Sequence, residues 1–344
     1  MTDTATAVPA PTPTAPARSA PVGGAWVRWV LRRIGLAVLT LWLVSLLVFA
    51  ATTALGDPVR AILGRDYEAS PGRVAQLREQ LHLDWSWPHR YLDWLGGLFT
   101  GDLGTSVSNN LPVSSLIGDR IVNSAVLVAA AAIVAIPVSF GVALLCARFR
   151  QGKLDQGVQV GLLGLAALPE FVIGILLVAL LSTTVLHWFP AVTISEGGSA
   201  PWHHPVSMVL PVITLVLAVA PYIIRILRAT LLEVLDSDYV ELARLKGVPE
   251  RVVLRRHALL NAVVPGIQVI ALQLAWLAGG VVIVEYLFSY PGIGASLVDS
   301  VTNSDFPMVQ ALSMVIAAVY VVVNLVADVL AILFTPKART EISS

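Results

Sequence analysis

The feature that most constrains this chain is an apolar run from Ile34 to Leu55, which contains no charged residue. At about 1.5 Å per residue, a helix of this length crosses a hydrocarbon core of roughly 30 Å. Arg28, Arg32 and Arg33 precede the run. A cleavable signal peptide is the competing interpretation, but its apolar region would span roughly 7 to 15 residues and lie nearer the amino terminus. We therefore expect a first transmembrane helix over residues 28–56.

Five further long apolar stretches follow the first. They lie at about residues 121–147, 158–186, 206–227, 263–287 and 308–334. With 56% hydrophobic and 13% charged residues, the composition is far from that of a soluble domain. The sequence thus predicts an all-α integral membrane protein with six transmembrane helices. Kinks are expected where proline interrupts or flanks a span, because neighbouring helices can satisfy the freed backbone groups. These prolines are Pro137, Pro169, Pro211 and Pro221.

The charge, the cysteine content and the absence of catalytic motifs argue against several classes of function. The formal net charge is zero, so the overall balance gives no indication of a nucleic-acid partner. Cys146 is the single cysteine, which excludes an internal disulfide or a Cys-based zinc site. His203 and His204 are adjacent in a Pro-rich loop without a nearby acid, an arrangement that makes weak metal ligands. The chain has no Gly-x-Ser-x-Gly elbow and no His-Glu-x-x-His helix, so we expect no catalytic residue and no metal site.

Basic residues near the ends of the spans set the expected orientation. They gather before the first span, between the second and third, between the fourth and fifth, and after the sixth. The loops at residues 187–205 and 288–307 contain no Lys or Arg. By the positive-inside rule both termini are cytoplasmic. Residues 1–27, rich in Pro, Ala, Thr and Ser, are expected to form a disordered cytoplasmic tail, and residues 336–344 a second cytoplasmic tail.

The segment 57–120 forms a large external loop in this topology. Val74, Leu77 and Leu81 have helical spacing, which predicts an amphipathic helix on the outer face. Four aromatic residues would then lie at the level of the lipid headgroups. They are Trp85, Trp87, Tyr91 and Trp94. A small packed external subdomain is an equally good interpretation. The remaining permease core spans residues 121–335.

The most informative cytoplasmic connection is the loop 236–262 within that core. Asp238 followed by Glu241 is typical of a helix start, with the Asp side chain accepting a backbone N–H and the Glu reaching back. Gly247 can take the left-handed conformation that ends such a helix, and Pro249 suits the first turn of the next. The pattern predicts a helix, a tight corner and a second helix.

The first of these two helices has an apolar surface. Tyr239 and Leu242 supply it, and Ala243 leaves a low profile. In a cytosolic segment without a core of its own, such a surface indicates a binding partner. The alternative is that these residues pack onto the chain's own helix ends.

The same loop resembles the signature loop of ATP-binding-cassette (ABC) importer permeases. The resemblance rests on Glu241-Leu242-Ala243, then Gly247 after three residues and His257 after nine more. The segment from His257 to Pro265, which includes Asn261, is similar to the variant of the oligopeptide, dipeptide and nickel permease branch. Leu242 stands where the general signature has Ala, which loosens the match without disturbing the glycine corner.

Other strings similar to that branch occur in the expected order. They are Gly56-Asp57-Pro58, the segment 101–106, Glu285 with the segment 288–294, and Asp305-Phe306-Pro307. Each string alone is weak evidence, but their joint order and spacing are specific. The resemblance covers roughly residues 28–337.

The resemblance implies a type I ABC importer permease fold in the cell membrane, with the loop seated in a groove of a cytoplasmic ATPase. The implied partners are a second homologous permease subunit, two ATPase subunits or a fused ATPase, an external substrate-binding lipoprotein, and membrane lipid. ATP and Mg would be bound by the ATPase partners, because this chain has no Gly-x-x-x-x-Gly-Lys-Ser/Thr loop. The residues implied in ATPase coupling are Asp238, Tyr239, Glu241, Leu242, Ala243, Gly247, His257, Asn261 and Pro265.

The implied substrates are peptides, with nickel chelates, glutathione and oligosaccharides as alternatives. Polar residues within the apolar runs are candidates for a gate or pathway, because such groups are costly in a membrane. They are Glu285, Asn324 and Asp328. Two other function classes compete. An ion-coupled secondary carrier would be expected to show internal inverted repeats, which we do not find. A membrane enzyme would need a catalytic arrangement.

Overall fold

The computed structural model describes residues 22–54, 56, 58–63, 71–80, 82–193, 200–254 and 259–334. Apart from one isolated bridge between Thr105 and Pro112, the described residues form helices, turns and loops. The α-helices are α1 Val22–Ala54, α2 Pro58–Leu63, α3 Pro71–Gln80, α4 Trp87–Thr100, α5 Val113–Arg148, α6 Lys153–Ala167, α7 Glu170–Val178, α8 Pro205–Leu235, α9 Asp238–Leu245, α10 Glu250–Val252, α11 Leu259–Leu287, α12 Ile293–Thr302 and α13 Phe306–Phe334. A π-helical turn follows α7 at Ala179–Thr183, and a 3₁₀ turn, Pro201–His203, precedes α8.

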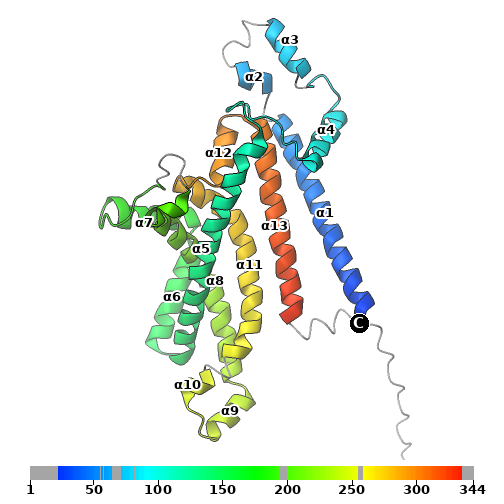
Figure 1. The fold of residues 1–344 in the computed structure, drawn as a ribbon. Coiled ribbons are helices and arrows are strands. Elements are labelled where there is room, and N and C mark those ends of the chain that lie inside the picture. The colour runs from blue at the N-terminus through cyan, green and yellow to red at the C-terminus, as the bar shows by residue number, and fades with distance from the viewer. Residues whose placement is uncertain are drawn as a thin grey trace, which may run out of the picture.

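Six crossings fit this architecture. Within the described residues four helices are long and apolar enough to cross a membrane, and the count rises to six if each of two bent pairs is one span. Figure 1 shows α2, α3 and α4 at one end of the bundle and α9 and α10 at the other. The start of α1 and the end of α13 lie at the same end as α9, as an even number of crossings requires.

The helix α8 lies at the centre of the bundle. It packs against α5, α6, α7 and α11. In the most apolar stretch of α8, 72% of the residues are buried, whereas the corresponding share is 17% in α1 and 17% in α13. Pro211 and Pro221 lie inside α8 and Pro137 inside α5, and none of the three ends its helix. Apolar burial therefore concentrates on α8, while α1 and α13 leave most of their apolar surface uncovered.

The third predicted span, residues 158–186, is broken. α6 and the helix from Glu170 to Thr183 meet at 105°. Leu168 has φ −90° and ψ 132°, because the ring of the following Pro169 disfavours the helical conformation of the residue before it. The kink expected at Pro169 is thus a sharp corner.

Two helices, α1 and α5, begin at earlier residues than predicted. α1 begins at Val22, so the helix includes the last residues of the predicted tail 1–27, of which 1–21 lie outside the described residues. Residues 336–344 likewise lie outside them. α5 begins at Val113, inside the predicted external loop.

The described residues of the loop after the first span include three helices, α2, α3 and α4. The helix predicted from the spacing of Val74, Leu77 and Leu81 is α3, and Leu81 lies outside the described residues. The aromatic residues belong mainly to α4, which packs against α1: Phe49 lies 5.4 Å from Trp87 and 5.5 Å from Tyr91, measured between ring centroids. The Tyr91 and Ser45 hydroxyls are 2.9 Å apart and share a hydrogen bond. These contacts fix α4 across the end of α1.

Candidate functional site

The helix α9 begins one residue earlier than its predicted cap would place it. The N-cap is Ser237, with φ −80° and ψ 148°, and no side chain caps the helix. The prediction of Asp238 as the cap is therefore wrong: Asp238 and Glu241 both lie in the first turn. The Ser237 hydroxyl instead donates to the Val234 carbonyl, 2.5 Å away, at the end of α8. The two acids still favour the helix because they lie near its positive dipole end.

The corner after α9 is a Schellman motif. Gly247 has φ 80°, the left-handed conformation that its sequence context predicts. Its N–H donates to the Arg244 carbonyl at 2.9 Å, and the Val248 N–H donates to the Ala243 carbonyl at 3.1 Å. Pro249 then precedes α10 as its N-cap. A Cβ on Gly247 would meet no atom within 4 Å, so the backbone conformation alone favours glycine here.

Arg244 ties the corner to the rest of the chain. Its guanidinium donates to both carboxylate oxygens of Glu250, at 2.8 and 3.1 Å, and to the Leu235 carbonyl at 3.1 Å. The Arg244 guanidinium lowers the pKa of the Glu250 carboxyl below its usual value, and Glu250 raises the pKa of Arg244. This fork joins the end of α8, α9 and α10 in one geometry.

One face of α9 packs inward and the other is open. Val240 is fully buried. Tyr239, Leu242 and Leu245 are 45%, 52% and 78% exposed. Within the described part of the chain, Val240 thus supplies the inward packing of α9. Tyr239 and Leu242, which the sequence analysis named as an apolar surface, are about half exposed to solvent. An exposed apolar face of this kind is typical of a docking surface.

The remaining residues predicted in this loop are less fully described. His257 lies outside the described residues, and Asn261 and Pro265 lie in α11 at positions whose side chains are not described. Among the described residues no group of three or more His, Cys, Asp or Glu could hold a metal ion.

Glu285 lies at the other end of the molecule, where it joins three helices. Its side chain is fully buried. The Ser124 hydroxyl of α5 donates to one carboxylate oxygen at 2.5 Å, and the N–H groups of Gly294 and Ala295, in the first turn of α12, donate to the other at 2.7 and 3.4 Å. A Cβ on Gly292 would collide with this carboxylate. In this conformation the predicted gate residue is a buried anchor for α12.

The neighbouring string after α11 is also fixed to α5. The Tyr290 hydroxyl donates to the Asn123 carbonyl at 2.8 Å, and the Asn123 amide donates to the Pro291 carbonyl at 2.8 Å. Burial raises the pKa of the Tyr290 phenol, which favours its role as a donor.

Two strings far apart in sequence meet at the start of α13. Asp305 is 2% exposed and accepts hydrogen bonds from the Ser106 hydroxyl and from the N–H groups of Val107 and Ser108. The carboxylate also accepts from the Met308 N–H at 3.4 Å. The segments 101–106 and 305–307 of the sequence analysis therefore form one polar contact.

Asn324 and Asp328 lie between α13 and α1. The Asp328 carboxylate pairs with the Arg33 guanidinium at 2.8 Å, and the Asn324 amide donates to the Tyr320 carbonyl of its own helix at 2.9 Å. These residues line a cavity of about 170 Å³ between the two helices. In this conformation they face α1 of the same chain.

A buried ion pair that the sequence analysis did not single out joins α6 to α8. Asp155 is 1% exposed, and Arg228 donates to both of its carboxylate oxygens at 2.6 Å. The sequence does contain a signal for this pair: Asp155 lies at the start of one apolar run, and Arg228 lies at the end of another.

A bundle of helices long and apolar enough to cross a membrane, with an exposed helical corner at one end, is the architecture of a multi-pass membrane protein. The comparisons identify its family. Residues 135–340 match the family described as "Binding-protein-dependent transport system inner membrane component", and residues 26–128 match the family of its N-terminal part. The chain belongs to this family.

Curated relatives agree with the family match. The chain is 34% identical to the glutathione transport system permease protein GsiC of Pectobacterium atrosepticum over 90% of this chain and 98% of that protein. It is 33% identical to the GsiC protein of an Escherichia coli O6:H1 strain and 34% identical to that of Salmonella typhimurium, in each case over 91% of this chain and 99% of the relative. The protein is therefore a permease subunit of an ABC importer, a class that works with a substrate-binding protein and ATPase partners.

Proposed function

We propose that this chain forms half of a translocation path for small peptides, delivered by an external binding protein and energised by separate ATPase subunits. Glutathione, itself a tripeptide, is the first candidate substrate, because the relatives that cover nearly the whole chain are named for its transport. Di- and oligopeptides follow, and nickel chelates and oligosaccharides are the remaining alternatives. This chain binds no cofactor in this scheme, and ATP and Mg belong to the ATPase partners.

The proposed coupling element is the α9–Gly247–α10 corner. The observation that carries this proposal is its combination of an open apolar face with a fixed backbone: Leu242 and Leu245 are exposed, while Arg244 binds Glu250 and the Leu235 carbonyl. A rigid lever that ends in an exposed apolar surface can transmit displacement of a docked ATPase to α8. Because α8 is the most buried of the four unbroken spans and packs against α5 and α11, its movement would reach both helices.

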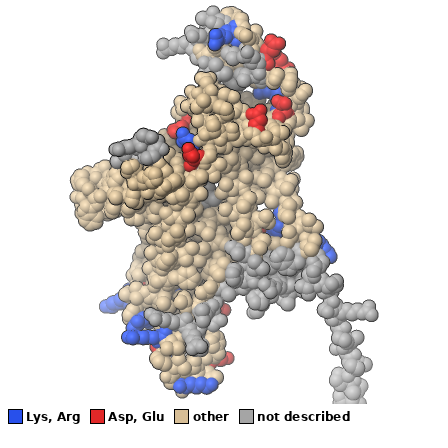
Figure 2. Space-filling view, in the orientation of Figure 1, with Lys and Arg blue, Asp and Glu red and all other residues tan. Residues whose placement is uncertain are grey.

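The proposed orientation places α9 in the cytoplasm. Figure 2 shows Lys and Arg gathered at the end of the molecule that contains α9, α10 and the turn between α5 and α6. This asymmetry favours that end as the cytoplasmic one, with both termini on the same side. The loop with α2, α3 and α4 would then be external.

A second, homologous permease subunit is the proposed partner within the membrane. A groove of about 480 Å³ is lined almost entirely by apolar side chains of α5, α11, α12 and α13, and α1 and α13 have mostly uncovered apolar faces. A partner helix can cover such surfaces by close packing in the bilayer. We favour a heterodimer over pairing with an identical copy.

The coupling role is tested by Gly247→Pro, which removes the left-handed corner and its N–H donor. We expect the variant to insert and assemble while ATP-driven glutathione or peptide uptake in proteoliposomes falls by about tenfold or more. Gly247→Asn is the matched control, because asparagine tolerates the left-handed conformation and should retain most uptake. Normal uptake by Gly247→Pro, or failure of Cys crosslinks from position 243 to reach an ATPase, would refute the coupling role.

A further inference from the structure

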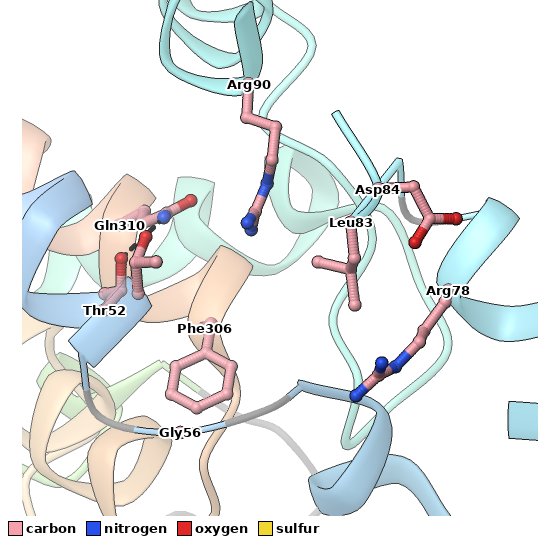
Figure 3. Close-up of a pocket in the computed structure, with 9 residues that line it drawn as sticks. Thr52, Gly56, Arg78, Leu83, Asp84, Arg90, Phe306 and Gln310 are labelled. Atoms are coloured by element: carbon pink, nitrogen blue, oxygen red, sulfur yellow. Dashed lines mark hydrogen bonds between the residues drawn. The ribbon is translucent and has the colours of Figure 1, made fainter. Parts of the chain in front are cut away.

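A polar cavity of about 380 Å³ lies where the end of α1 meets the start of α13, under the segment that joins α3 to α4. Its volume is within the range of small-molecule sites. A second cavity of about 220 Å³ adjoins it and shares Leu83, Arg90, Phe306 and Gln310 with it. Figure 3 shows the lining side chains of the first cavity, which come from α1, α3, α4, α13 and the turn between α3 and α4.

The amide of Gln310 has a fixed direction in this cavity. Its Nε2 donates to the Thr52 hydroxyl oxygen at 2.7 Å. The Thr52 hydroxyl in turn donates to the Val48 carbonyl of its own helix at 2.9 Å, so it can only accept from Gln310. The Gln310 amide nitrogen is therefore directed to Thr52, and its carbonyl oxygen remains as an acceptor for the cavity.

Arg90 supplies a donor beside this acceptor. Its side chain is half-buried, and Figure 3 shows the guanidinium extending from α4 into the space above Phe306, on the same side as Gln310. Among the described residues its guanidinium has no hydrogen bond or ion pair. A half-buried guanidinium favours an anionic partner with planar oxygens, which it can bind in a bidentate manner.

The opposite wall carries charges of both signs. Figure 3 shows Arg78 and Asp84 together on that side, with Leu83 between them and Arg90. The lining of the cavity thus has two arginines and one aspartate. A cavity with cationic, anionic and neutral polar groups around an apolar floor is better matched to a zwitterionic solute than to a simple anion.

We propose that this cavity is a subsite for a peptide-like solute, with Arg90 binding a carboxylate and the Gln310 carbonyl oxygen accepting from a neighbouring N–H. A phosphate monoester is mostly a dianion with acceptor oxygens alone at neutral pH, so it would place an oxygen against the Gln310 carbonyl. A peptide terminus presents a carboxylate and an amide N–H a few atoms apart. The inference rests on the proposed function, because it assumes that the α4 end is external and that peptides are transported.

The test uses the assembled transporter in lipid nanodiscs and triglycine as the probe, with its carboxy-terminal amide as the probe that lacks the carboxylate. Binding of both is measured by saturation-transfer NMR and by quenching of tryptophan fluorescence, since Trp85 and Trp94 line the adjoining cavity. We expect Arg90→Gln to weaken triglycine binding about ten- to hundredfold, the range for loss of a charge-assisted hydrogen bond. The wild-type transporter should bind the amide as weakly as Arg90→Gln binds triglycine.

Arg73→Gln is the matched control, because Arg73 is an exposed arginine of α3 that does not line the cavity. It should leave triglycine binding unchanged. Equal loss in Arg73→Gln, equal binding of the two probes, or competition for the site by phosphatidylglycerol in the nanodisc would each overturn the inference, the last by assigning the cavity to lipid. Basal ATPase activity of Arg73→Gln should equal that of the wild type. A complex that assembles and couples normally but shows no Arg90-dependent binding refutes this inference while leaving the proposed function intact.

Discussion

Two helices at opposite ends of the bundle, α12 and α9, are attached to it in different ways. At the α12 end, buried polar groups join α5, α11 and α12, with Glu285 fully buried and bonded to Ser124, Gly294 and Ala295. At the α9 end, the Arg244–Glu250 contact that fixes the corner is partly exposed, and the apolar side chains Leu242 and Leu245 face outward. The buried pair of Asp155 and Arg228 joins α6 to α8 and does not contact α9. The first arrangement resists rearrangement, because each separation would leave an unsatisfied buried group. The second leaves surface for a partner at little internal cost.

The difference indicates where the molecule can move. The buried polar network around Glu285 makes the α12 end a fixed point. The corner formed by α9 is rigid, and among the described elements α9 makes its main contacts with α8. Force applied at α9 would therefore pivot α8 about the fixed end. Substitutions at one end or the other test this difference.

The largest effect is expected from Glu285→Ala. It would leave the Ser124 hydroxyl and two N–H groups of α12 without their acceptor in the protein interior. We expect a loss of about 3 kcal/mol or more in stability, measured as a lower thermal midpoint of the purified subunit in detergent. Glu285→Gln, which keeps one carbonyl oxygen, should lose less. The control Glu233→Ala alters an exposed acid of α8 and should shift the midpoint little. A midpoint for Glu285→Ala equal to that control would contradict the anchoring role.

A smaller loss, about 2 kcal/mol, is expected from Asp305→Ala, because two of the donors it releases, the N–H groups of Val107 and Ser108, lie nearer to solvent and can be hydrated. The local consequence should be faster proteolysis or hydrogen exchange in that segment, measured by mass spectrometry. Asp299→Ala changes an exposed acid of α12 only six residues away and serves as the control. Unchanged exchange at residues 106–108 in Asp305→Ala would show that the segment is held by other contacts.

The smallest effect is expected from Glu250→Gln at the α9 end. The ion pair with Arg244 is partly exposed, and such pairs contribute at most about 1 kcal/mol. Because Arg244 lowers the pKa of Glu250 in the folded chain, the contribution is present above the unfolded value near 4.5 and is lost as pH falls through the folded pKa. The wild-type and variant thermal midpoints should thus differ slightly at pH 7 and converge toward pH 3. If the difference between the two thermal midpoints grew as the pH fell, it would contradict the lowered pKa of Glu250.

The sequence predicted the elements well and their mutual contacts poorly. Hydropathy located the four unbroken spans and the two bent pairs, and the glycine corner at Gly247 followed from helix-end chemistry, because both signals are local. The pairing of Glu285 with Ser124, of Asp305 with Ser106 and of Asp155 with Arg228 joins residues distant in sequence, for which local periodicity contains no information. The cap at Ser237 was missed because Ser and Asp are adjacent and both favour that position.

The corner at Pro169 has a consequence for the surrounding lipid. α6 contains 15 residues and rises about 22 Å, which is less than the roughly 30 Å of an average hydrocarbon core. After the corner, the chain runs at 105° to α6 and cannot make up the difference along the same axis. The bilayer beside this element must therefore thin or the short helix must settle in one leaflet, so that acyl-chain length becomes a determinant of this protein's conformation.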